Sequence, residues 1–114
     1  MERDNIELVR KLCSIADEAF RSDASLGRRY PNSPAGRGAG SSGLISLVRD
    51  RRGHDRRYAI NSGKLERELG YRALTSNARG LRDTFDRYIQ NERWWHDVIN
   101  GSYRQWIERQ YPVT

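Results

Sequence analysis

The sequence predicts a mixed α/β domain that is mostly helical, with two short strands and about four helices. Apolar residues recur every three or four positions over residues 5–20 and again from residue 76 onward, which is the period of helices with one apolar face. Two short segments, 44–48 and 58–60, are mostly apolar or alternating, as strands are. A length of 114 residues is typical of one domain, and with 36% hydrophobic and 32% charged residues its core is expected to be thin.

The first predicted helix spans residues 5–20. Asp4 followed by Glu7 is the pattern of a capping box at a helix start. The only cysteine, Cys13, lies in the apolar stripe with no second cysteine or histidine nearby, so we expect a small core residue rather than a disulfide or zinc site. The stripe consists of Ile6, Val9, Leu12, Cys13, Ala16 and Phe20.

Residues 21–43 are expected to form a long loop. They hold two of the three prolines and half of the ten glycines, and they show no hydrophobic period. Residues 38–43 match the pattern G-x-G-x-x-G. A dinucleotide fingerprint needs a strand before this pattern and a helix after it, because the pyrophosphate rests on that helix's N-terminus. Here a loop precedes and a strand-like segment follows, so we interpret the match as chance.

The two predicted strands flank an arginine-rich segment. Residues 44–48, Leu-Ile-Ser-Leu-Val, predict a short buried strand, and the alternation of Tyr58 and Ile60 with smaller or polar neighbours predicts a second. Asn61 or Ser62 is then expected to cap a short helix. That helix should end at Gly70, because glycine tolerates the positive φ of a helix terminus.

From Ser76 onward the helical period predicts a long helix, followed after Asn100-Gly101 by a last helical turn or two. Asn-Gly is usually a hairpin signal, but its flanks here have helical period, so we interpret it as a helix end and restart. Aromatic residues in this region could stack on nucleic-acid bases, but at helical spacing we expect core or subunit contacts. They are Trp94, Trp95, Tyr103, Trp106 and Tyr111.

The charge of the chain is +6 and comes almost entirely from arginine, with 19 arginines and two lysines. Such a charge suggests nucleic acid as a binding partner. Acidic residues are interspersed among the arginines, however, and this disfavours a nucleic-acid-binding protein. No segment approaches the roughly 20 apolar residues of a membrane span, and the N-terminus lacks a signal-peptide pattern. We therefore expect a cytoplasmic protein with no membrane partner.

Charged residues, a histidine and a glycine are concentrated between Asp50 and Asn61. Arginine presents a planar fork of N–H donors that matches phosphate oxygens, and glycine lets the backbone approach a ligand closely. The alternative is a solvated loop, in which aspartates pair with arginines at about 0–1 kcal/mol each. His54 and His96 are too isolated to suggest a metal site, and no catalytic motif is present. The candidate phosphate- or diphosphate-binding residues are Arg51, Arg52, Gly53, His54 and Asp55.

The residue order over 50–60, followed by Lys-Leu-Glu-Arg-Glu-Leu-Gly-Tyr at 64–71, closely resembles the C-terminal part of dTDP-glucose 4,6-dehydratases, in the extended short-chain dehydrogenase/reductase superfamily. The Asn-Ile-Glu-Leu-Val start of the first helix and the Asn-Gly-Ser-Tyr-Arg-Gln-Trp-Ile run at 100–107 are similar to the same family. The resemblance runs in order over essentially the whole chain. Arg52 stands where the family usually has proline, which frees the loop backbone.

The resemblance implies that residues 1–114 are a partial C-terminal region that binds dTDP-glucose or a related dTDP-sugar. It places Arg51 on a diphosphate oxygen, with Gly53, His54 and Asp55 near the nucleotide. In the family an N-terminal Rossmann domain holds NAD, and the tyrosine base, lysine and acidic pair for the reaction have no match here. We therefore expect a truncated family member with no catalytic residues, which binds no NAD and is inactive alone.

Two alternatives to this function stay open. One is an arginine-rich module that binds nucleic acid nonspecifically. The other is a subunit that complements a separate Rossmann half, or a homodimer.

Overall fold

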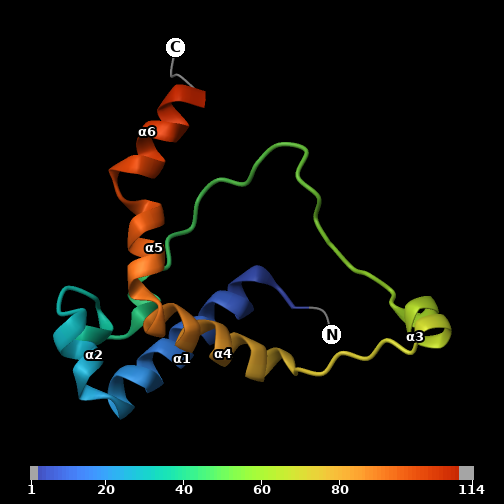
Figure 1. The fold of residues 1–114 in the computed structure, drawn as a ribbon, viewed down its shortest axis with the longest axis horizontal. Helices are drawn as coiled ribbons and strands as arrows, with labels where there is room; N and C mark the ends of the chain where they lie inside the picture. The colour runs from blue at the N-terminus through green and yellow to red at the C-terminus, as the bar shows by residue number, and fades with distance from the viewer. Residues whose placement is uncertain (1–2, 111–114) are drawn as a thin grey trace. The chain divides into compact units, whose positions relative to one another are not determined.

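The computed structural model describes residues 3–110 and divides the chain into two units, Met1–Asn77 and Ala78–Thr114. The described residues are mostly helical, as predicted (Figure 1). No helix among them is both long and apolar enough to cross a membrane. The first unit contains α1 (Asn5–Ser22), α2 (Ala24–Arg29), the 3₁₀ helices η1 (Ala35–Arg37) and η2 (Ser41–Leu44), and α3 (Gly63–Leu69). From Asn77 onward the helices are α4 (Asn77–Gln90), α5 (Glu92–Ile99) and α6 (Gly101–Gln110).

The prediction of two strands was wrong, because the part of the chain between residues 3 and 110 contains none. Leu44 ends η2. Residues 45–50 have no regular secondary structure, and neither do residues 57–60. A strand is stable only when its backbone N–H and C=O groups pair with a neighbouring strand. Neither segment pairs with one, and Leu47 and Ile60 are 87% and 96% exposed.

The prediction of a long loop over residues 21–43 was also wrong in part, since α2, η1 and η2 lie within it. Asp23 caps α2 by accepting a hydrogen bond from the Ser25 backbone N–H at 2.9 Å. Ser33 then fastens a tight turn: its hydroxyl donates to the Tyr30 carbonyl at 2.7 Å and accepts from the Gly36 N–H at 3.0 Å. These polar side chains organise a segment that has no hydrophobic period.

The core of the first unit is thin, as expected. Ile15 and Ala19 on α1 and Leu26 on α2 are its buried apolar residues within the described range, and α1 contacts α2, η1 and η2. The Phe20 and Tyr30 rings lie beside this core with centroids 6.2 Å apart.

Local signals at the ends of α1 and α3 were predicted correctly. The capping box at Asp4 and Glu7 is present, with the Glu7 carboxylate accepting from the Asp4 N–H at 3.3 Å. Before α3, the Asn61 side-chain oxygen accepts from the Gly63 N–H at 2.9 Å. Gly70 ends α3 with a φ of +65°, in the left-handed region that favours glycine.

The long helix predicted from Ser76 is divided at Asn91, whose φ of −118° and ψ of 42° interrupt the helical backbone between α4 and α5. The restart at Asn100-Gly101 is confirmed, because α5 ends at Ile99 and α6 begins at Gly101. The described residues therefore contain six α-helices rather than about four. Trp94, Tyr103 and Trp106 are exposed in this unit rather than in a core, and Tyr111 lies outside the described residues.

Candidate functional site

The five predicted ligand-binding residues lie together on one exposed loop of the first unit. Asp50 begins it, with its carboxylate accepting from the Arg51 backbone N–H at 2.7 Å. The chain then turns at Arg52 and Gly53, and Gly53 has a φ of +68°. A residue with a Cβ rarely adopts that φ, so glycine at this position favours the reversal that brings the two sides of the turn together.

The turn brings the Arg51 and His54 side chains together. The Arg51 Nη2 atom lies 2.9 Å from His54 Nε2. A guanidinium can only donate, so Nε2 is the acceptor in this arrangement and the neutral imidazole carries its proton on Nδ1. Both residues are exposed.

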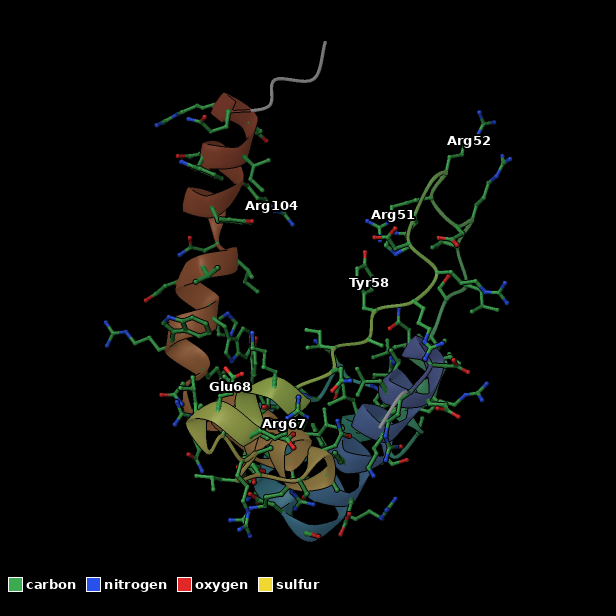
Figure 2. The ribbon with its side chains drawn as sticks, turned by 90° about the vertical axis from the view of Figure 1, so that its right-hand side faces the viewer. Arg51, Arg52, Tyr58, Arg67, Glu68 and Arg104 are labelled. Carbon is green, nitrogen blue, oxygen red and sulfur yellow. The ribbon has the colours of Figure 1, made fainter. Side chains whose placement is uncertain are left out.

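Tyr58 completes the cluster from the segment that follows the turn. Its ring centroid lies 6.3 Å from that of His54, with the planes inclined by 58°. Figure 2 shows the Tyr58 side chain on the same side of the loop as that of Arg51, whereas Arg52 points in a different direction. Sequence reasoning took Tyr58 only as a strand residue. Its spacing of four from His54 was the available signal, but outside a helix that spacing does not predict contact.

The donors of this arrangement can bind an anion. Arginines outnumber aspartates over residues 49–57, so the loop is locally positive. The described residues contain no group of histidine, cysteine and carboxylate side chains that could hold a metal ion. His96, the second histidine, lies on α5, where its ring stacks on Trp95 and its Nε2 lies 3.2 Å from the Glu92 carboxylate.

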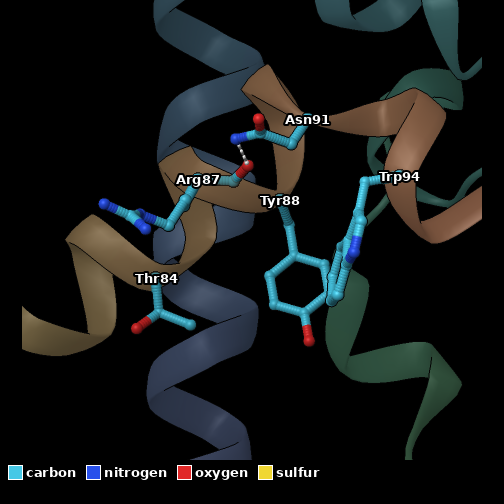
Figure 3. A pocket seen from close by; sticks show the side chains of 5 residues that line it. All are labelled: Thr84, Arg87, Tyr88, Asn91 and Trp94. Carbon is cyan, nitrogen blue, oxygen red and sulfur yellow. Dashed lines mark hydrogen bonds between the residues drawn. The ribbon is translucent and has the colours of Figure 1, made fainter.

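A separate open pocket of about 410 Å³ lies in the second unit, where α4 meets α5 (Figure 3). The Tyr88 and Trp94 rings form one side, edge to face, with centroids 6.3 Å apart. The Asn91 amide donates to the Arg87 carbonyl at 2.8 Å, which fixes the break between the helices. Sequence reasoning did not single out this pocket. Its lining residues are Thr84, Arg87, Tyr88, Asn91 and Trp94.

Comparison with known proteins points to one family. The chain is 41% identical over 103 residues to a dTDP-glucose 4,6-dehydratase of Neisseria meningitidis. The aligned region covers 90% of this chain and 26% of the relative. It is 36% identical over 110 residues to that of Salmonella typhimurium, covering 96% of this chain and 26% of the relative. For the enzyme of Xanthomonas campestris the identity is 37% over 103 residues, with coverages of 90% and 26%.

The chain therefore spans about a quarter of the length of the curated relatives it matches. No model of a known protein family matches the sequence, and no solved structure matches it. The matched residues correspond to a C-terminal part of those enzymes, in agreement with the order of motifs along the chain. Over these residues the chain is similar to the C-terminal part of dTDP-glucose 4,6-dehydratases.

Proposed function

We propose that this chain supplies the loop that binds the diphosphate of a dTDP-sugar in a dTDP-glucose 4,6-dehydratase. The observation that carries the proposal is the exposed Arg51 guanidinium, on a turn made by Gly53 and held by His54 at 2.9 Å. The name dTDP-glucose 4,6-dehydratase belongs to the relatives, and it suggests the ligand class for this loop.

The chemistry of the loop suits a diphosphate. A guanidinium has five N–H donors in a planar fork, so Arg51 keeps donors for phosphate oxygens while one of them contacts His54. A charge-assisted hydrogen bond of this kind contributes about 1.5–3 kcal/mol. In the proposal Arg52 adds positive charge, the flexible Gly53 backbone lets the ligand approach, and His54 and Asp55 lie near the nucleotide.

The proposal leaves the reaction itself to other parts of the enzyme. The resemblance to the family implies NAD bound by a Rossmann domain and proton-transfer groups that have no counterpart among these residues. We therefore expect the 114 residues on their own to bind no NAD and to leave dTDP-glucose unchanged. The proposed location is cytoplasmic, as expected from the sequence.

The proposal is tested by titrating dTDP into the ¹⁵N-labelled chain at low ionic strength and following amide shifts around Gly53. Arg51→Ala is expected to raise Kd by roughly 10- to 150-fold, the equivalent of about 1.5–3 kcal/mol. Arg104→Ala is the matched control, since it removes the same charge from an exposed position on α6 (Figure 2).

Two results would overturn the assignment. One is absence of dTDP binding by the parent chain. The other is an equal loss of affinity in Arg51→Ala and Arg104→Ala, because that pattern indicates general attraction to positive charge, as a nonspecific nucleic-acid binder would show.

A further inference from the structure

We infer that His54 is a positioning residue for Arg51: its neutral ring accepts a hydrogen bond from the guanidinium and orients the remaining donors toward an anion. This inference rests on the proposed function, because it concerns how the same loop binds. It assigns His54 a role through Arg51 rather than a contact with the phosphate itself.

The geometry allows one direction for this bond. Arg51 Nη2 and His54 Nε2 are 2.9 Å apart, and arginine has no acceptor. The lone pair on Nε2 therefore receives the N–H, and the ring proton lies on Nδ1. Because the guanidinium is planar and rigid, fixing one terminal nitrogen limits the directions that the other N–H groups can take.

The surrounding loop restrains both partners. The Asp50 carboxylate holds the Arg51 backbone N–H at 2.7 Å, and Gly53 makes the reversal with a φ of +68°. The centroid of the Tyr58 ring lies 6.3 Å from that of the His54 ring, so the two rings are neighbours on this loop. Arginine loses much side-chain freedom when it is ordered, so a bond formed before the ligand arrives reduces that loss on binding.

A contact between His54 and the phosphate is the competing explanation, and a double-mutant cycle separates the two. The chain, Arg51→Ala, His54→Ala and the double variant are each titrated with dTDP. If His54 acts through Arg51, His54→Ala raises Kd about fivefold in the parent chain and less than about twofold in the Arg51→Ala background. A fivefold effect in both backgrounds overturns the inference.

A conservative variant provides a second readout. Glutamine carries a side-chain oxygen that can accept from the guanidinium, so His54→Gln should restore Kd to within about twofold of the parent value. Phenylalanine keeps a ring beside Tyr58 but has no acceptor, so His54→Phe should behave as His54→Ala does. Recovery with phenylalanine rather than glutamine would indicate ring packing alone and would contradict the inference.

The tautomer of His54 is a third readout, and it does not depend on dTDP. Side-chain ¹⁵N spectra of the free chain at alkaline pH, where imidazole is neutral, should show the proton on Nδ1, and Arg51→Ala should abolish that preference. A proton on Nε2 in the parent chain overturns the inference while leaving the proposed function intact. A normal dTDP affinity in Arg51→Ala overturns the proposed function instead.

Discussion

The Asp17 carboxylate accepts two hydrogen bonds from Ser41, from the backbone N–H at 2.9 Å and from the hydroxyl at 2.6 Å. These bonds join the middle of α1 to the start of η2 across 24 residues of sequence. Ser41 is buried and polar, so the carboxylate satisfies groups that would otherwise be desolvated without a partner. With few buried apolar residues nearby, this polar contact has a large share in ordering the segment between them.

Asp17→Ala is expected to lower the free energy of unfolding of the first unit by about 1.5–3 kcal/mol, because hydrogen bonds to a charged acceptor are lost and Ser41 is left unpaired. Asp17→Asn keeps one acceptor oxygen and should cost about half as much. The measurement is urea unfolding followed by amide signals of α1 and η2, since all three tryptophans lie in the second unit and do not report on the first.

Asp97→Asn is the control for this series. Asp97 is an exposed aspartate on α5, where a surface substitution should change stability by less than about 0.5 kcal/mol. If the Ser41 amide exchanges with solvent equally fast in Asp17→Ala and in the parent chain, the contact does not order η2.

Gly36→Ala is expected to destabilise the turn that follows α2. An added Cβ would clash with the Tyr30 carbonyl oxygen and approach the Ser33 hydroxyl to 2.9 Å. Overpacking of this kind costs about 1–3 kcal/mol, and here the obstacle is backbone that cannot rotate away. Faster amide exchange at Ser33 and Arg37 is the observable, since both N–H groups bond within this turn at 3.2 and 3.1 Å.

Gly43→Ala provides the matched glycine control. Nothing lies within 4 Å of the Cβ that it would add, so the change should be neutral or slightly stabilising. Equal exchange rates in the two alanine variants would show that the space around Gly36 does not limit the turn.

Local features of this fold were predictable because their causes are local. A carboxylate before α1, a glycine after α3 and a helix restart at Asn100 each depend on a few neighbouring residues. The absence of strands between residues 3 and 110 was not predictable in the same way. The pattern at 44–48 and 58–60 favours strands, but a strand also needs a partner, and the described residues provide none.

The candidate site shows the same division. Arginine and glycine composition was sufficient to select residues 51–55 as a loop of interest. The bond between Arg51 and His54 was not predictable, because it depends on the positive φ of Gly53 rather than on a regular period. The helical turns within 21–43 depend likewise on long-range and side-chain contacts such as Asp17 with Ser41.

The pKa of Asp23 is lowered from its ordinary 3.8, chiefly because the Ser25 hydroxyl and then the Ser25 backbone N–H donate to its carboxylate. A depressed pKa in the folded state means that Asp23 stabilises the start of α2 above its unfolded pKa. That contribution is lost as the pH falls from about 3.8 through the folded pKa. We predict that Ser25→Ala raises the Asp23 pKa toward its ordinary value, measured by a carboxyl ¹³C titration.

Ser14→Ala is the control for this titration. The Ser14 hydroxyl donates to the Arg10 carbonyl within α1, so its removal should leave the Asp23 titration unchanged. A midpoint that moves equally in both serine variants would show that the shift does not depend specifically on the Ser25 hydroxyl.

The exposed apolar side chains of the two unpaired segments predict self-association of the isolated chain. Leu47, Val48 and Ile60 are 87%, 86% and 96% exposed, on backbone that has no strand partner. Exposed apolar segments with unpaired backbone groups tend to pair between copies. Replacing Leu47 and Ile60 together by serine should therefore reduce the concentration dependence of the weight-average mass in sedimentation equilibrium.

The opposite result is expected from Leu26→Ser, because Leu26 is only 3% exposed and its substitution opens the core of the first unit. Association should then increase, and the amide spectrum of α1 should collapse, whereas the Leu47 and Ile60 double variant should keep the parent spectrum. The two variants differ in whether the serine replaces an exposed or a buried side chain. Equal mass curves for the parent and the double variant would place the association surface elsewhere on the chain.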